Sequence, residues 1–584
     1  MKRRHILLWC GVALLGGCTS WNLTGAKSKA HDPPETVELE TPVVGELAAP
    51  FGMFPVKLEA VGLVVGLHGT GSDPEPSAQR SMLMDEMQRR GVKNPNELLT
   101  SKDVALVLVR GVLRPGIQKG DRFDVEVRIP ARSETTSLRG GRLLETRLSD
   151  MALVQGRLLD GKVRAVAQGP VLVDPSADEK NERVLLGRGR VLGGGIAFQP
   201  RSLGLVVKDA EEANNMTAEQ LKDACFKSAR IASVINRRFH IFKSGIKTDV
   251  ASAKSGKYID LMIHPRYKDN VDRYMQVIRA IAMDDSAVAI NRRIRELDKK
   301  LFDAPSSAAA AMQLEGIGTR GIDTLLKGVA STDREVRFYS AEALAYLDRR
   351  EAAEPLATAA RQEPAFRVFA LTALSAMEDF SAYEQLRELL AVPSAETRYG
   401  AFRALWKMNP NDALVKGEPL GGQFSYHVLS TEGPPMIHVT RNHRAEVVLF
   451  GRDQRFLAPL AINAGNRIMV TAQSAGEISV SKFAPNEPDQ KRTVSSRVDD
   501  VVRAIVELGG TYPDVVQAFQ EAKAAGALEG RFEVEAIPEV GRTYERLLQP
   551  EGEDESAKAA AAAAAKDTSK DGDTNTSVKG DSRS

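Results

Sequence analysis

A repeat of about thirty residues in the second half of the chain constrains the fold more than any other feature. The segments VRFYSAEALAYL (336–347), FRVFALTALSAM (366–377) and TRYGAFRALWKM (397–408) align without gaps. Each segment has an arginine at its second position and an alanine–leucine pair at its eighth and ninth, namely Arg337, Arg367 and Arg398, with Ala343–Leu344, Ala373–Leu374 and Ala404–Leu405. A fixed period with helical spacing of apolar residues predicts a stacked array of helical hairpins.

The aligned segments resemble short HEAT-like repeats. This resemblance implies an array of paired helices over residues 304–416, whose exposed faces either hold a partner or only keep a spacing. A single irregular helical bundle over the same residues is the alternative.

The regions on both sides of the repeats are rich in strands. Between 58 and 208, short apolar runs are broken by glycine, and residues 123–129 alternate between apolar and charged side chains as in a half-exposed strand. One helix is expected at 77–91, with Met82, Leu83, Met84 and Met87 on its apolar face. Helices at 217–239 and 271–283 flank a strand at 258–265, and strands resume at 423 before two helices within 495–530. The fold class is therefore α+β: strand-rich domains with packed helices, interrupted by a HEAT-like helical region.

The composition of the chain argues against a nucleic-acid partner. The 79 basic and 77 acidic residues give a net charge of +2, so the chain has no electrostatic footprint for a polyanion. Aromatic residues make up 5% of the chain, too few for a protein that stacks the bases of single-stranded nucleic acid. We therefore expect no nucleic-acid partner.

The first eighteen residues have the features of a bacterial export signal. Lys2, Arg3 and Arg4 precede an apolar stretch that is too short to span a membrane. The stretch ends in Leu-Gly-Gly-Cys18, which resembles a lipobox. This resemblance implies cleavage before Cys18, lipidation of Cys18 and, because Thr19 follows, an outer-membrane location. An ordinary cleaved signal or an uncleaved anchor is the alternative. Residues 19–57 then form a tether, and the low-complexity residues 548–584 a disordered tail.

Cysteine usage predicts a fold without an internal disulfide. Removal of the signal and lipidation of Cys18 leave Cys225 as the only free thiol. It falls within an amphipathic helical pattern, and no nearby residue would lower its pKa. We expect Cys225 to be a buried apolar residue.

The stretch GLVVGLHGTGSD (62–73) invites a ligand-binding interpretation, but each candidate motif fails at a particular residue. A Walker loop needs a lysine after its last glycine, and here Ser72 and Asp73 follow Gly71. A dinucleotide fingerprint has the glycine order GxGxxG, whereas this order is GxxGxG. His68 in a hydrolase-like oxyanion loop would require a nucleophile such as Ser474, yet the segment after Ser474 reads as a strand and not as a helix.

No other residues form a catalytic or metal-binding pattern. His438 and His443 are the closest histidines and lack zinc-helix spacing. The acidic residues lie on exposed helices or in the tail, including Glu551, Glu553, Asp554 and Glu555. The sequence therefore predicts no enzyme activity, no metal and no cofactor.

The order of several strings resembles the flagellar basal-body P-ring protein family. The strings are VGLVVGLHGTGSD, DVALVLVRGVLRPGIQKGDRFDVEVRI, TSLRGGRLLETRL, VRAVAQGPVLV and ARIASVINRRF, followed near the end by VDDVVRAIVELGGTYPDVVQAFQEAKAAGAL. They place P-ring-like regions at 58–303 and, less evenly, at 417–547. The helical array at 304–416 then becomes an insertion, which should project from a ring.

The resemblance implies a non-enzymatic subunit of a ring that surrounds the flagellar rod in the periplasm and acts as a bushing for motility. Its partners would be other copies of the chain, the rod and the L-ring protein, with peptidoglycan as a further possible contact. Under this interpretation five glycines have a structural role, because they allow tight or left-handed backbone. They are Gly66, Gly69, Gly71, Gly140 and Gly141. Lys119, Arg122 and Arg139 could face peptidoglycan or a neighbour, or could be ordinary surface charges. The alternative is an outer-membrane-anchored envelope lipoprotein that is not flagellar and uses its repeats as a protein-binding scaffold.

Overall fold

The computed structural model describes residues 27–29, 42–154, 157–173, 183–208, 217–422, 424–441, 444–483 and 488–546. Two compact units are present: residues 33–540, and residues 1–32 together with 541–584. In the second unit, β1 (Lys27–Lys29) pairs antiparallel with β23 (Thr543–Glu545). The expected signal peptide, the lipidation site Cys18 and the tail at 548–584 lie outside the described residues.

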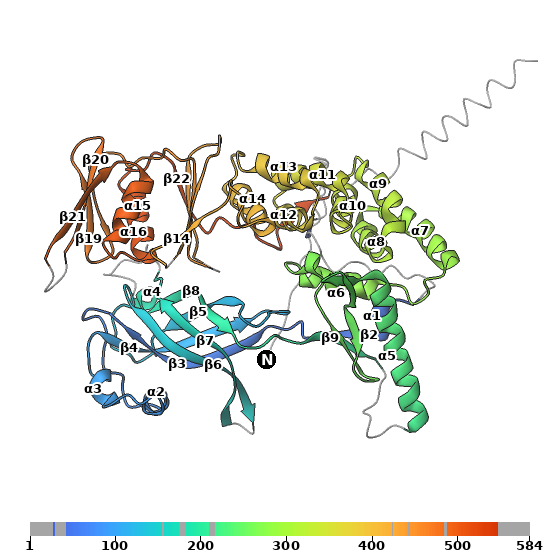
Figure 1. Cartoon of the computed structure of the whole chain (residues 1–584), viewed down its shortest axis with the longest axis horizontal. Helices are drawn as coiled ribbons and strands as arrows, with labels where there is room; N and C mark the ends of the chain where they lie inside the picture. Colours follow the sequence, from blue (N-terminus) through green and yellow to red (C-terminus); the bar gives the residue numbers. More distant parts are fainter. Residues whose placement is uncertain are drawn as a thin grey trace, which may run out of the picture. The chain divides into compact units, whose positions relative to one another are not determined.

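Six antiparallel strands of the larger unit close into a barrel (Figure 1). In spatial order they are β3 (Val56–Val65), β4 (Val104–Leu113), β5 (Arg122–Arg128), β8 (Arg188–Ala197), β7 (Arg157–Pro170) and β6 (Arg142–Val154). Phe123, Val125 and Val127 all point into the barrel core, as their alternation predicts. Closure removes the sheet edges that could pair with another chain.

Helices cover part of the outer surface of the barrel. Leu83 and Met87 of α2 (Ala78–Arg89) pack on Leu63 of β3 and Leu106 of β4, beside the short α3 (Pro95–Leu99). Met82 is 37% exposed, so the expected apolar face of this helix is narrower than predicted. The one-turn helix α4 (Arg183–Leu186) precedes β8.

A four-stranded sheet with two helices follows the barrel. Its order is β12 (Ala251–Ala253), β13 (Tyr258–Leu261), β9 (Leu203–Val207) and β2 (Ala48–Phe51), with α1 (Val44–Leu47) leading into β2. The helices are α5 (Ala218–Arg238) and α6 (Val271–Ala280), and β10 (His240–Lys243) forms a separate hairpin with β11 (Ile246–Asp249). Because β2 and α1 precede residue 57, the expected tether at 19–57 is too long.

Cys225 is a correction to the sequence analysis. It lies on α5 and is exposed, not buried. The helical pattern is real, but the buried residues of α5 begin only at Ser228, so the first half of the helix has little to pack against.

The predicted helical array is present and follows α7 (Ala287–Leu301). Its helices are α8 (Ala304–Ile317), α9 (Ile322–Val329), α10 (Arg334–Tyr346), α11 (Ala353–Gln362), α12 (Arg367–Ala376), α13 (Phe380–Leu389) and α14 (Ala395–Met408). The repeated alanines and leucines are buried between them.

The repeated arginines have one shared role in this array. Arg337 donates to the Ser331 carbonyl at 2.8 Å, and Arg367 donates to the Ala360 carbonyl at 2.9 Å. Arg398 repeats the contact with Leu390 at 2.8 Å. In each repeat, the arginine of the second helix thus satisfies a carbonyl at the C-terminal end of the first, where carbonyls lack helical partners and a positive charge is favoured.

The chain returns to strands after the array and forms two sheets. One has the order β14 (Glu418–Leu420), β15 (Phe424–Leu429), β17 (Glu446–Phe450), β16 (Met436–Val439) and β22 (Arg531–Val534). The other has the order β18 (Leu460–Ala464), β19 (Ile468–Ala472), β20 (Glu477–Lys482) and β21 (Gln490–Ser495). The helices α15 (Val498–Glu507) and α16 (Tyr512–Ala524) share one apolar core with both sheets.

Candidate functional site

The loop after β3 is held by hydrogen bonds to two other segments of the barrel domain. The Gly69 N–H donates to Asp103 Oδ1 at 3.0 Å, and the Gly71 N–H donates to the Lys102 carbonyl at 2.8 Å. The Thr70 hydroxyl lies 2.8 Å from the Ser137 carbonyl. Because these backbone donors already have protein acceptors, the loop has no set of free N–H groups to cradle a phosphate or an oxyanion.

Two of the family-like strings meet at this end of the barrel. The Thr136 N–H donates to the Thr70 carbonyl at 2.9 Å, which joins the 66–72 loop to the 133–141 loop. Among the glycines singled out from the sequence, φ is +79° at Gly66, +90° at Gly69 and +74° at Gly140. A Cβ at Gly71 would lie 2.1 Å from the Val104 carbonyl oxygen, so the backbones approach too closely for a side chain there.

The residues of the hydrolase hypothesis do not form a catalytic site. The His68 ring lies 2.7 Å from Arg467 Nη2. Ser474 lies in the turn between β19 and β20, with no helix after it. A nucleophile elbow requires a strand followed by a helix, so this arrangement does not support acyl-transfer chemistry.

A buried charged cluster joins the array to the α5–α6 domain. Arg273 of α6 lies 2.6 Å from Glu315 of α8 and 2.7 Å from Glu342 of α10. The Tyr267 hydroxyl donates to Glu315 Oε1 at 2.5 Å, and the rings of Tyr267 and Tyr346 stack 4.7 Å apart. We call these five residues the N-terminal joint. Both carboxylates are fully buried, and Arg273 is 4% exposed.

The ionisation of the N-terminal joint reflects two opposing effects. Burial raises the pKa of Glu315 above its usual value, although the Arg273 charge opposes this shift. Burial disfavours the charged form of Arg273, but its two carboxylate partners outweigh that cost and raise its pKa. The joint therefore depends on one guanidinium that balances two buried carboxylates.

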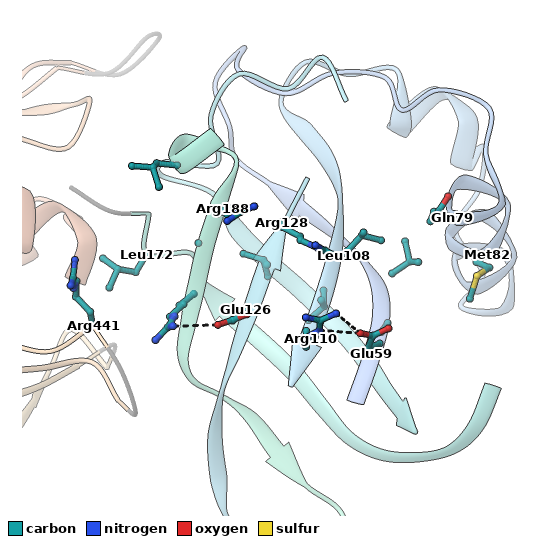
Figure 2. Close-up of a pocket in the computed structure, with 17 residues that line it drawn as sticks. Glu59, Gln79, Met82, Leu108, Arg110, Glu126, Arg128, Leu172, Arg188 and Arg441 are labelled. Atoms are coloured by element: carbon teal, nitrogen blue, oxygen red, sulfur yellow. Dashed lines mark hydrogen bonds and ion pairs between the residues drawn. The ribbon is translucent and has the colours of Figure 1, made fainter. Parts of the chain in front are cut away.

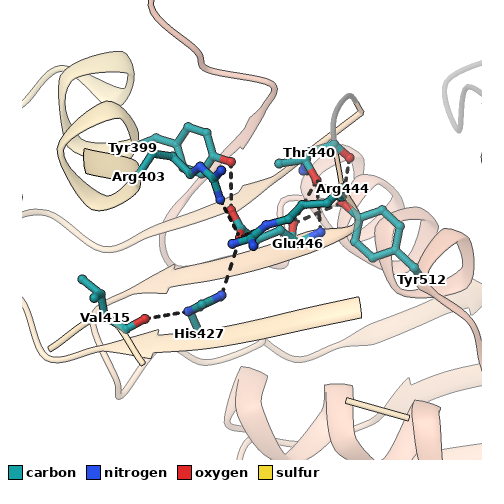
Figure 3. A network of polar contacts seen from close by, with 8 residues as sticks. All are labelled: Tyr399, Arg403, Val415, His427, Thr440, Arg444, Glu446 and Tyr512. Atoms are coloured by element: carbon teal, nitrogen blue, oxygen red, sulfur yellow. Dashed lines mark hydrogen bonds and ion pairs between the residues drawn. The ribbon is translucent and has the colours of Figure 1, made fainter. Parts of the chain in front are cut away.

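A second buried charged cluster joins the array to the C-terminal sheet (Figure 3). The fully buried Glu446 of β17 accepts from the Tyr399 hydroxyl at 2.9 Å and from Arg403 at 3.3 Å, both on α14. It also accepts from Arg444 Nε at 2.9 Å, while His427 Nε2 lies 3.5 Å away. We call these five residues the C-terminal joint. Burial disfavours the Glu446 carboxylate, but the His427 contact and the two guanidinium groups outweigh it and lower its pKa.

Beside this joint, His438 is buried in its neutral form. The Ala536 N–H donates to His438 Nε2 at 3.0 Å, so that nitrogen cannot carry a proton, and the His438 ring stacks 3.6 Å from the Tyr399 ring. Burial lowers the pKa of His438 to about 3, against partial opposition from Glu446.

Replacing His438 by glutamine is expected to flatten the pH dependence of stability. The folded pKa is below the ordinary value near 6.5, so the contribution to stability is complete above about pH 6.5 and is lost as pH falls toward 3. The free energy of unfolding of wild type should fall by about 2 kcal/mol between pH 7 and pH 5 because of His438 alone. Urea titrations that follow Trp406 fluorescence, with Trp21 replaced by phenylalanine, test this. If the free energy of unfolding changes equally with pH in the variant and in wild type, this prediction is wrong.

Sequence reasoning did not identify either joint. Glu446 appears in AEVVLF as an ordinary strand charge, and its partners on α14 lie more than forty residues earlier. Glu315 and Arg273 likewise lie on helices without any motif. Arg122, which was singled out, donates to the Gly193 carbonyl at 3.1 Å and so has a structural contact within the barrel.

Membrane-spanning helices and metal-binding groups are the two remaining features to consider. In the parts of the chain that the structure describes, no helix is both long and apolar enough to cross a membrane. The same residues contain no group of three or more histidine, cysteine, aspartate or glutamate side chains placed to hold a metal ion.

Comparison with known proteins identifies two regions. Residues 44–295 match the family profile of the flagellar P-ring protein, and residues 322–406 match that of HEAT repeats. The first match covers the barrel and the α5–α6 domain, and the second falls within the helical array.

Similar proteins named flagellar P-ring protein occur in several bacteria. The chain is 29% identical to that of Thermotoga petrophila over 245 residues, which are 41% of this chain and 66% of the relative. It is 32% identical to that of Fervidobacterium nodosum over 245 residues, with the same coverage. For Geotalea uraniireducens the values are 28% over 254 residues, 42% of this chain and 62% of the relative. The match thus spans just under two thirds of these relatives.

The family profile ends at residue 295, so the expected likeness of residues 417–547 to the same family stays a prediction. The resemblance inferred for the N-terminal strings and for the repeats is confirmed. Residues 44–295 of this chain are therefore similar to the flagellar P-ring protein family, and residues 322–406 of the same chain are similar to HEAT repeats.

Proposed function

We propose that the protein is a non-enzymatic structural subunit of the flagellar basal-body P ring, which assembles in the periplasm around the rod. The observation that carries this proposal is the family match over residues 44–295. That match covers the complete barrel and the following domain, so it rests on a whole folded region and not on a single motif.

The two loops at one end of the barrel form a rigid surface, which supports a mechanical role. The loops at 66–72 and 133–141 are hydrogen-bonded to each other, and close backbone contact leaves no room for a side chain at Gly71. Such a surface has little freedom to open around a small ligand. It is well suited to hold a fixed shape against neighbouring subunits and against a rotating rod.

The helical array is held at both of its ends. The N-terminal joint ties α8 and α10 to α6, and the C-terminal joint ties α14 to β17. Within the proposed ring, the array is an insertion with fixed attachments, and its remaining surface is available for a partner of the basal body. The L-ring protein, the rod and peptidoglycan are the partners that the P-ring role implies.

Attachment to the outer membrane is a further part of the proposal. Cleavage before Cys18 and lipidation of that residue would place a lipid at the start of the mature chain. Several acyl chains give a durable anchor, because each buried methylene contributes about 0.8 kcal/mol.

Deletion of the gene tests the proposed function. We expect the deletion strain to lose swimming, and its isolated basal bodies to lack the P ring in electron micrographs. Expression of the full chain from a plasmid should restore both. Cells that keep swimming, with every ring present in their basal bodies, would rule out the flagellar role.

The rival function is a protein-binding scaffold on an envelope lipoprotein, and the HEAT-repeat match favours it. Under this alternative, deletion would leave the basal body complete, and the phenotype would be an envelope defect. The same deletion strain therefore distinguishes the two functions.

A further inference from the structure

The outer face of the barrel carries one row of charges that are internally balanced. Glu59, Arg110, Glu126 and Arg190 lie directly opposite one another across β3, β4, β5 and β8. Arg110 Nη2 lies 2.8 Å from Glu59 Oε1, and Arg190 Nη2 lies 3.2 Å from Glu126 Oε1 (Figure 2). The signs alternate across the four strands, so each charge in this row has an opposite neighbour.

The next row on the same face is not balanced. Two residues further along each strand, the cross-strand neighbours are Val61, Leu108, Arg128 and Arg188 in that order. Arg128 and Arg188 are directly opposite and exposed, and neither has an ion pair with any residue that the structure describes. Like charges directly opposite each other in a sheet are destabilising, so the fold alone gives no reason for this pair.

This unbalanced row lies in a groove of about 710 Å³. Gln79 and Met82 of α2 line the groove together with all four residues of the row (Figure 2). One end of the row is therefore apolar and next to a helix, and the other end is strongly basic. We call this surface the arginine groove.

A complementary surface is present on the first half of α5. Residues 218–227 include no buried side chain, although they extend the helix by almost three turns. Glu219, Asp223 and Phe226 follow the spacing i, i+4 and i+7 and share one face of the helix. Phe226 is 70% exposed, and neither carboxylate has an ion pair within the described part of the chain.

We propose that the first half of α5 from one copy docks in the arginine groove of the next copy. The proposal rests on the ring assembly of the proposed function. Neighbouring strands are about 4.8 Å apart, so the row from Arg188 to Leu108, its first apolar residue, spans about 10 Å. A helix rises about 1.5 Å per residue, so Glu219 to Phe226 spans about 10 Å.

The order of the side chains matches as well as the length. Glu219 and Asp223 face Arg188 and Arg128, and Phe226 covers the apolar end of the row. The exposed aromatic residue and the desolvated arginines are the residue types that carry most binding energy in interfaces. The two surfaces are different, so the contact is head to tail, which generates a ring when the rotation per step closes.

Charge reversal tests the contact in the native bacterium. The variant R128E/R188E keeps a like-charge pair in the barrel, so its fold should be unaffected. We expect R128E/R188E and E219R/D223R each to reduce the amount of chain in isolated basal bodies more than tenfold. The combination of all four substitutions should restore most of it. The control R164Q/R237Q removes two arginines from partly exposed ion pairs that lie outside both surfaces, and it should assemble like wild type. Normal assembly of either reversed variant, or no restoration in the combination, would overturn the proposal.

A cross-linking test separates this inference from the proposed function. Two differently tagged copies are co-expressed, both with Cys225→Ser, one with Arg128→Cys and the other with Asp223→Cys. A disulfide-linked heterodimer on a non-reducing gel can form only between copies, whether or not the structure they build is flagellar. We expect this heterodimer, and we expect none when Lys491→Cys replaces Arg128→Cys. Its absence while the deletion strain lacks P rings would reject the docking site and leave the P-ring function intact. If the heterodimer forms in a strain whose basal bodies do not need the protein, the docking site is supported and the P-ring function is rejected.

Discussion

Replacing Glu446 by glutamine is expected to lower the free energy of unfolding of the C-terminal domain by about 3–5 kcal/mol. The substitution removes the buried negative charge that Arg403 and Arg444 share. Arg403 and Arg444, whose side chains are 26% and 28% exposed, would then stay charged beside a fully buried position that no longer carries the compensating charge. Leaving a buried charge without its partner costs far more than an intact pair contributes, which is the basis of the expected size.

The measurement for Glu446 is a urea titration at pH 7 that follows Trp406. This tryptophan lies beside the C-terminal joint, with the Arg444 guanidinium 3.9 Å from its ring centre, so its fluorescence reports local unfolding. The control is Glu533→Gln on β22, because Glu533 forms a partly exposed pair with Arg531 in the same sheet. The control should lose less than about 1 kcal/mol. Equal losses for the two variants would contradict the role of Glu446.

The pH dependence of the Glu446 variant has a definite sign. The folded pKa of Glu446 is lowered, so its contribution to stability is present above the ordinary glutamate pKa and is lost as the solution becomes more acidic. The deficit of the variant should therefore be largest at neutral pH and should shrink below about pH 4.5.

Replacing Arg273 by methionine at the N-terminal joint is expected to lower the free energy of unfolding by about 3–5 kcal/mol. Methionine fills much of the same space, but Glu315 and Glu342 would lose the guanidinium that lies between them and balances both charges. Each then becomes easier to protonate, so the deficit should be larger at pH 8 than at pH 5. Thermal unfolding of the variant and of wild type at these two pH values is the measurement.

A triple variant gives the matching control for Arg273. Combining Arg273→Met with Glu315→Gln and Glu342→Gln removes the uncompensated charges, and we expect it to recover most of the lost stability. Buried ion clusters can often be replaced by uncharged residues of similar size without loss. A deficit for Arg273→Met below about 1 kcal/mol and independent of pH would show that the joint is not held by its charges.

The sequence predicts best the features that depend on local periodicity. The thirty-residue repeat identified the helical array, because apolar spacing and the position of the arginine are set within each repeat. The structure adds the reason for the arginine, which satisfies a carbonyl at the end of the preceding helix. The alternation around Phe123 and Val125 likewise identified a strand with one buried face.

Features that depend on distant pairing could not be predicted from the sequence. Closure of the barrel needs β5 to pair with β8, whose residues lie sixty or more positions later, and no local pattern records that pairing. Arg128 and Arg188 read as ordinary strand charges until the register places them directly opposite. The burial of Cys225 was predicted wrongly for a related reason, because an amphipathic pattern does not show where the covering surface stops.

Under the proposed function, this chain is a subunit of a flagellar ring. The most direct measurement is mass spectrometry of basal bodies purified from the native bacterium, with electron microscopy of the same particles. We predict that the chain is present in these particles, and that rings are missing from particles of the deletion strain. Absence of the chain from intact, ring-bearing basal bodies of motile cells would contradict it.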